Sequence, residues 1–163
     1  MKNIFQTAIA VIAFTLIFSA CSTVKNLPAA ATGASRARFV GTWTLNKIDY
    51  DGLVTGSVQN VFDQAPPNDF IGSTWKLTNS GNGIYTLTNG TSQTIFWSVN
   101  NNGVNKGQIF QFKKLYEGDK ARKVQEGYQL IVDSQDGKAM IVKSPITLGS
   151  KTAYIIYSFT KNP

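Results

Sequence analysis

The segment GIYTLTNGTSQTIFWSV, residues 83–99, indicates most directly how this chain folds. On both sides of the dipeptide Asn89-Gly90, apolar side chains alternate with polar ones, many of them threonine. A period of two is typical of a β-strand with one buried face, and Asn-Gly between two such runs is a strong hairpin signal. The apolar positions are Tyr85 and Leu87 before the dipeptide, and Ile95, Trp97 and Val99 after it.

The same alternation continues outward in both directions, and no segment shows helical periodicity. Together, the alternating segments predict eight successive strands, each with one apolar face. Such strands bury their apolar faces best by closing on themselves, which also removes exposed edges. We therefore predict an all-β fold, an eight-stranded antiparallel up-and-down barrel. The further apolar faces are Phe39, Trp43 and Leu45; Ile71, Trp75 and Leu77; Phe110 and Phe112; Tyr128, Leu130 and Val132; Met140 and Val142, or else Ala139 and Ile141; and Ala153, Ile155, Tyr157 and Phe159.

Three places interrupt the pattern. The phase of the first strand shifts near Lys47, which suggests a β-bulge. Residues 52–69 indicate a long loop with a few apolar residues, in which a short helical or strand piece stays open, and Pro66-Pro67 argues against a helix beyond these two prolines. Residues 114–126 read as a charged loop.

The N-terminus ends a short apolar run with Leu16-Ile17-Phe18-Ser19-Ala20-Cys21, which contains the one cysteine of the chain. With Lys2 in front, this segment resembles a bacterial lipoprotein signal with its lipobox. We therefore predict a signal peptide at 1–20, an acylated Cys21 with a flexible tether at 21–37, and the barrel at 38–163. Two alternatives stay open: an uncleaved anchor, for which the run is slightly short, and cleavage near residues 29–31, which would release the protein.

The lipoprotein reading also predicts a location and a partner. Acyl chains such as palmitate on Cys21 would hold the protein on a lipid bilayer, firmly once two or more chains are attached. No acidic residue directly follows Cys21. We therefore expect a lipid-anchored protein of the bacterial cell envelope, on the outer membrane and facing the periplasm.

The formal net charge of +7 raises the question of nucleic acid. The basic residues are spread along the chain, and acidic residues interrupt their main cluster. No nucleic-acid recognition motif accompanies that cluster. We expect a solvated loop there, no nucleic-acid partner, and a monomeric protein. If the cluster does act, an anionic membrane surface is its nearest partner. The cluster consists of Lys113, Lys114, Lys120, Arg122 and Lys123.

The chain contains no histidine, and its one cysteine is the predicted lipidation site. Histidine-dependent nucleophilic catalysis and imidazole-based zinc sites are thereby excluded. The nine carboxylates form no catalytic pattern, and those of Asp51-Gly52 and Asp136-Gly137 suit turns. We expect no enzyme activity, no metal and no cofactor.

The first predicted strand, Val40-Gly41-Thr42-Trp43-Thr44-Leu45, resembles the first strand of the lipocalin barrel. Ile71 to Leu77, followed by Gly83-Ile84-Tyr85, is similar to the next two strands of the lipocalin-like lipoproteins of Bacteroidetes-type bacteria. The resemblance runs from about Arg38 to Lys161. It implies that Gly41 and Trp43 form the barrel floor, with Lys161 as the nearest candidate for the basic residue that the family pairs with this tryptophan.

Eight strands leave room for packed side chains or for one small ligand. An aromatic wall suits a small hydrophobic or amphipathic ligand. Two readings therefore remain: a tethered ligand-binding barrel, or a solid-cored envelope lipoprotein that acts through its outer face and has no small-molecule ligand. The candidate ligand-binding residues of the barrel interior are Trp75, Tyr85, Trp97, Phe110, Phe112, Tyr128 and Tyr157.

Overall fold

The structure is a computed structural model that describes residues 35–163 apart from 102, 104–106 and 125–126. The predicted signal peptide, Cys21 and most of the predicted tether lie outside these described residues. The described chain opens with a short 3-10 helix, η1 (Arg36–Arg38), capped by the Ser35 side chain, which accepts a hydrogen bond from the Ala37 N–H. Within the described ranges, no helix is long and apolar enough to cross a bilayer.

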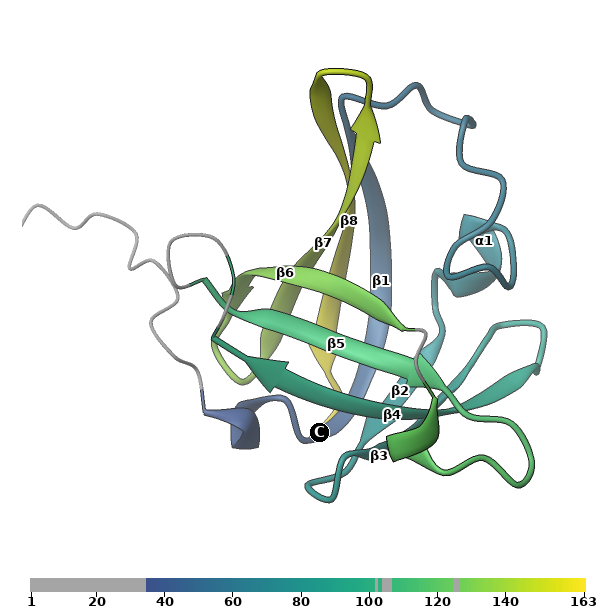
Figure 1. The fold of residues 1–163 in the computed structure, drawn as a ribbon, viewed down its shortest axis with the longest axis vertical. Coiled ribbons are helices and arrows are strands. Elements are labelled where there is room, and N and C mark those ends of the chain that lie inside the picture. Colours follow the sequence, from purple (N-terminus) through teal and green to yellow (C-terminus); the bar gives the residue numbers. More distant parts are fainter. Residues whose placement is uncertain (1–34, 102, 104–106, 125–126) are drawn as a thin grey trace, which may run out of the picture.

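Eight strands form one closed antiparallel barrel, in which each strand pairs with the next and the last pairs with the first (Figure 1). The predicted all-β up-and-down barrel is confirmed. Along each strand buried side chains alternate with more exposed ones, as a pleated sheet around a common core requires. The strands are β1 (Gly41–Asp51), β2 (Thr74–Leu77), β3 (Asn82–Thr86), β4 (Ser92–Asn100), β5 (Ile109–Lys114), β6 (Tyr128–Gln135), β7 (Ala139–Leu148) and β8 (Lys151–Lys161).

The turn between β3 and β4 lies at Asn89-Gly90, where the sequence predicts it. The Leu87 N–H donates to the Thr91 carbonyl at 2.8 Å, and the Thr91 N–H donates to Asn89 Oδ1 at 2.9 Å. Gly90 has a φ of +87°, which glycine adopts at little cost because it has no Cβ. The local turn chemistry thus sets the register of this hairpin.

The predicted bulge in β1 is also confirmed. Pairing with β8 passes from Leu45↔Phe159 to Lys47↔Ser158, so β1 holds one extra residue between these pairs. After the bulge Ile48 returns to the buried face. The bulge therefore explains why the apolar phase shifts without a break in the strand.

The 52–73 connection differs in part from the expectation. Ile71 is exposed and precedes β2, which begins at Thr74, so it does not belong to the apolar face of that strand. One helical turn, α1 (Pro67–Phe70), begins at Pro67 itself. Proline is tolerated in the first helical turn because its missing N–H would have no partner there, so the expectation that the two prolines prevent a helix is wrong.

For β7 the structure selects one of the two predicted phases. Met140 and Val142 are buried, whereas Ala139 is exposed and Ile141 is half-buried. The alternative phase would have placed Ala139 and Ile141 in the core. The predicted charged loop 114–126 holds a second 3-10 helix, η3 (Ala121–Lys123).

The up-and-down order of the strands gives the barrel two distinct ends. We call the end where β1 begins the floor; it also carries η1, the turns β2–β3 and β6–β7, and the end of β8. We call the opposite end the mouth; it carries the 52–73 connection, the 115–127 loop and the β7–β8 turn. In Figure 1 the C-terminal end lies near η1, far from the tip of the β7–β8 hairpin.

Candidate functional site

The structure gathers the predicted interior residues into one aromatic cluster. Six of the seven are buried and Tyr128 is half-buried. Trp75 stacks on Tyr85 with ring centroids 4.5 Å apart, and Phe112 lies 5.0 Å from Tyr128. Phe112 also contacts Trp75 and Phe110, and Phe110 continues the cluster to Trp97 near the floor. The strands thus build a continuous aromatic wall.

A further ring, Phe62, lies within this wall but belongs to no strand. It comes from the 52–73 connection and is 7% exposed. Its ring centroid lies 5.0–6.0 Å from those of five other rings. The sequence pointed to it only as one of several apolar residues in this loop, together with Val54, Val58 and Val61. The five rings are Phe70, Trp75, Phe112, Tyr128 and Tyr157.

The backbone that carries Phe62 is strained. Phe62 and Asp63 have φ angles of 51° and 48°, the only non-glycine residues with positive φ in the described part of the chain. A bulky residue in this region is an outlier, and each one costs about 1–3 kcal/mol. The tight turn is closed by an isolated bridge, in which the Val61 N–H donates to the Ala65 carbonyl at 2.8 Å.

Two side chains from the barrel rim hold this turn in place. Tyr128 Oη donates a hydrogen bond to the Phe62 carbonyl at 2.7 Å, and Lys114 Nζ donates to the same carbonyl at 3.0 Å. Tyr85 Oη donates to Gln64 Oε1 on the same turn. The Phe62 turn is therefore attached to the mouth by polar contacts from β3, β5 and β6 as well as by its packed ring.

The two buried phenols nearest this turn titrate well above their ordinary range. Burial raises the pKa of Tyr85, and the nearby Tyr128 adds to the effect. Burial likewise raises the pKa of Tyr157. Both groups stay neutral at physiological pH and can donate hydrogen bonds, but they are poor general bases. Among the described residues no group of three or more His, Cys, Asp or Glu side chains could hold a metal.

The floor is closed by Trp43, at the position that the family resemblance implies. Its ring is fully buried, its Nε1–H donates to the Phe39 carbonyl at 2.7 Å, and Lys161 Nζ lies 5.5 Å from the ring centroid. Gly41 has a φ of +137°, and a Cβ there would lie 2.4 Å from Lys161 Cε. The predicted pairing of this tryptophan with Lys161 is therefore present.

Two half-open cavities lie at the surface beside the aromatic wall. One, of about 270 Å³, is at the mouth and is lined by Asp63, Lys114, Tyr116, Asp119, Val124, Gly127 and Tyr128. The other, of about 260 Å³, lies mainly on the outer face of β4, β5 and β6. The mouth cavity directly adjoins the Phe62 turn, because Asp63 of the turn lines it together with Lys114 and Tyr128, which bind the Phe62 carbonyl.

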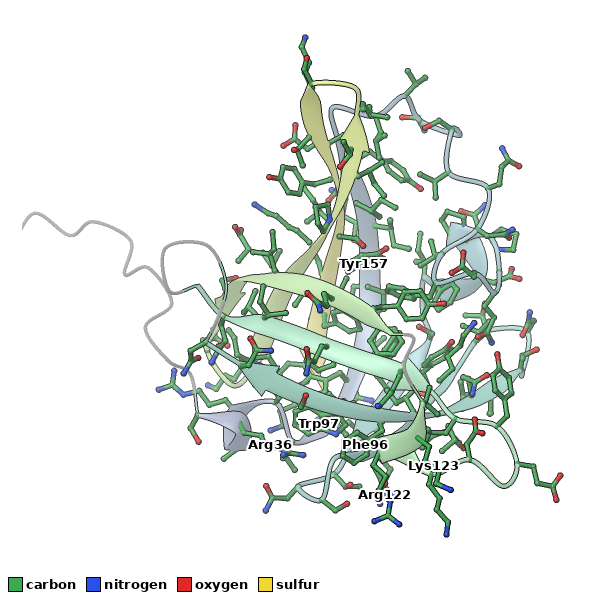
Figure 2. All side chains as sticks on the ribbon, viewed as in Figure 1. Arg36, Phe96, Trp97, Arg122, Lys123 and Tyr157 are labelled. Atoms are coloured by element: carbon green, nitrogen blue, oxygen red, sulfur yellow. The ribbon has the colours of Figure 1, made fainter. Side chains whose placement is uncertain are left out.

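The basic cluster of residues 113–123 divides into two kinds of side chain. Lys113 Nζ donates to the Val124 carbonyl at 2.6 Å and Lys114 is bound to the Phe62 turn, so both have structural partners. Arg122 and Lys123 extend from η3 into solvent (Figure 2). The cluster is thus not a single continuous cationic surface.

No protein-family model matches the chain, and no curated protein matches it. The closed eight-stranded antiparallel barrel is compatible with a lipocalin-like fold.

Proposed function

We propose that this protein is a lipocalin-like lipoprotein, anchored to the bacterial envelope through Cys21, that binds a small hydrophobic or amphipathic molecule in the mouth half of its barrel. In this proposal it is a monomer without enzymatic activity, it does not bind nucleic acid, and it faces the periplasm from the outer membrane. The observation that carries the proposal is the placement of Phe62, a loop residue, inside a wall of rings that the strands provide.

A ligand would take the place of the Phe62 ring. The rings of Trp75, Phe112 and Tyr157 belong to hydrogen-bonded strands and cannot leave without breaking the barrel. Phe62 can leave with its turn, which would also relieve the unfavourable backbone angles of that turn. The space that opens is the size of one aromatic ring and is lined by other rings, a shape that suits a flat apolar group.

The rim supplies the polar side of the same site. Lys114 Nζ and Tyr128 Oη now donate to the Phe62 carbonyl. When the turn moves out, these donors can bind a carboxylate or another acceptor group of the ligand. A charged acceptor would form the stronger bond with the lysine ammonium. We therefore favour an amphipathic ligand with an apolar ring and an acceptor group at its edge.

Replacing Phe62 with alanine tests this proposal. Phe62→Ala should bind 1-anilinonaphthalene-8-sulfonate about tenfold more tightly than the wild type, because the probe no longer has to displace a ring. The measurement is a fluorescence titration of residues 22–163, in which Trp75 transfers energy to bound probe. This piece contains every strand of the closed barrel, so each strand keeps both of its neighbours.

Phe110→Ala is the matched control, because Phe110 is also a buried ring but lies at the floor end of β5 and is not among the five rings beside Phe62. It opens a similar space far from the Phe62 turn and should not tighten probe binding. If neither the wild type nor Phe62→Ala binds the probe saturably, the ligand-binding proposal is wrong. That outcome would favour the solid-cored envelope lipoprotein, an alternative supported by the close packing of the interior rings.

The membrane anchor has a separate test. In bacteria fed a radiolabelled fatty acid, the wild-type chain should carry label and sediment with the membranes, whereas Cys21→Ser should lose both properties. The physical reason is that the thiol is the acceptor of the lipid, and each buried methylene contributes about 0.8 kcal/mol to membrane binding. Labelled Cys21→Ser, or unlabelled wild type, would refute the lipid anchor.

A further inference from the structure

Charged side chains are distributed unequally between the two ends of the barrel. Among the described residues of the floor, five basic residues stand against one acidic residue, Asp136. The turns that carry them are direct neighbours: Gln135 Nε2 donates to the Arg38 carbonyl at 3.4 Å, and the Lys161 N–H donates to the Lys138 carbonyl at 2.7 Å. The five basic residues of this floor patch are Arg36, Arg38, Lys76, Lys138 and Lys161.

The mouth is different, because it combines charges of both signs. Acidic residues of the 52–73 connection and the 115–127 loop accompany the lysines there. The acidic residues at or near the mouth are Asp49, Asp51, Asp63, Asp69, Glu117 and Asp119. Nearly all the excess positive charge of the described side chains therefore lies at the floor.

The charge of the floor patch is not cancelled within the protein. The ion pairs found among the described residues, Lys47–Asp49 and Lys143–Asp133, lie outside the patch. Asp136 Oδ1 accepts hydrogen bonds of 2.7 Å from the N–H groups of Lys138 and Ala139, so its carboxylate faces its own turn. Arg36 lies over the Trp97 ring, 4.7 Å from its centroid, and its Nε and Nη2 atoms are buried, so it adds positive charge to the floor while the exposed Arg38 and Lys138 are the side chains open to headgroups (Figure 2).

The floor is also the end at which the described chain begins. Ser35 caps η1, which packs beside the start of β1. The residues between Ser35 and the predicted acyl group on Cys21 therefore join the barrel next to the floor patch. A membrane that holds Cys21 would lie on the floor side of the barrel, and the predicted tether would let the patch come within about 10 Å of it, the range over which surface charges attract.

We infer that the floor patch docks on the headgroups of an anionic lipid bilayer. This inference rests on the proposed lipid anchor and adds an orientation to it. With the floor against the membrane, the mouth and the Phe62 turn face away from the lipid. A ligand would then enter the barrel from the aqueous phase and not from the bilayer.

Charge reversal at the two ends tests the inference. The protein is residues 22–163 without an acyl group, and the probe is vesicles of phosphatidylcholine with one-third phosphatidylglycerol. Wild type should co-sediment with these vesicles at low salt, and R38E/K138E should bind at least about tenfold more weakly, because each basic residue near an anionic surface accounts for roughly fivefold in affinity. Pure phosphatidylcholine vesicles and high salt should abolish binding.

K120E/K151E is the matched control, since it makes the same change in net charge with two exposed lysines at the mouth. It should bind anionic vesicles more tightly than R38E/K138E by several-fold. Equal losses in the two variants would overturn the inference, because they would show that only the net charge matters. No binding by the wild type would overturn it too.

A pair of labels checks the orientation. In residues 22–163, which contain no cysteine, Ser80→Cys places a thiol on the β2–β3 turn at the floor, and Ser150→Cys places one on the β7–β8 turn at the mouth; both serines are exposed. A fluorophore at 80 should be quenched by brominated lipids in the vesicles, and one at 150 should not. The reverse pattern would contradict docking through the floor. Because these assays need no acylation, their failure is distinct from a failure of the fatty-acid labelling experiment.

Discussion

Trp43→Ala is expected to lower the free energy of unfolding by about 3–5 kcal/mol, the range for deleting a fully buried large aromatic side chain. Trp43 has no exposed surface. It lies on β1, where it pairs with Lys161 at the end of β8. Its removal would leave a cavity at the floor and would also leave the Phe39 carbonyl without its 2.7 Å donor. Denaturant unfolding, followed by circular dichroism of the barrel, measures this loss.

Two further variants separate the contributions. Trp43→Phe keeps most of the ring but removes the N–H donor, and should cost about 1–3 kcal/mol for the unsatisfied buried carbonyl. Tyr116→Ala removes an aromatic side chain that is 64% exposed, and should change stability by less than about 0.5 kcal/mol. If Trp43→Ala proved as mild as Tyr116→Ala, Trp43 would not be the structural residue that the floor suggests.

Alkaline pH is expected to destabilise the barrel steeply above about pH 10, the ordinary pKa of tyrosine. Burial raises the pKa of both Tyr85 and Tyr157 in the folded protein. Above pH 10 the unfolded chain loses these two protons while the folded chain keeps them. The folded state then binds more protons, so stability falls as pH rises, by up to about 1.4 kcal/mol per pH unit for each tyrosine.

Removing the phenol groups tests which tyrosines cause the pH dependence of stability. In unfolding curves recorded from pH 9 to pH 11.5, Tyr85→Phe and Tyr157→Phe should each flatten the decline, and the double variant should flatten it most. Tyr116→Phe, at an exposed position, is the control and should retain the wild-type slope. A double variant with an unchanged slope would show that other groups cause the loss of stability at alkaline pH.

Most of the barrel was predictable because its signals are local. The apolar faces of β4, β5 and β8 follow directly from the period of two, and the Asn89-Gly90 turn follows from its dipeptide. The bulge near Lys47 was visible as a shift of phase in the sequence. Each of these features depends on residues a few positions apart, which a sequence displays without knowledge of the fold.

The 52–73 connection was not predictable in the same way. Its apolar residues follow no period, so neither the single turn of α1 nor the exposed position of Ile71 could be inferred. The place of Phe62 depends on rings from β2, β5, β6 and β8, which are far from it in sequence. A strained turn of this kind exists only because distant strands hold it.

The sequence by itself determined the number of strands, the face that every strand except β7 buries, and the excess of basic residues. It also carried the lipobox-like segment, whose Cys21 lies outside the described residues. Only the tertiary structure decided which residue occupies the middle of the aromatic wall, and which charges share the floor. The physical reason is that alternation arises from the geometry of a single strand. Which side chains fill a barrel and which lie at its ends depends instead on closure of the sheet. Closure brings together residues more than a hundred positions apart, such as Trp43 and Lys161.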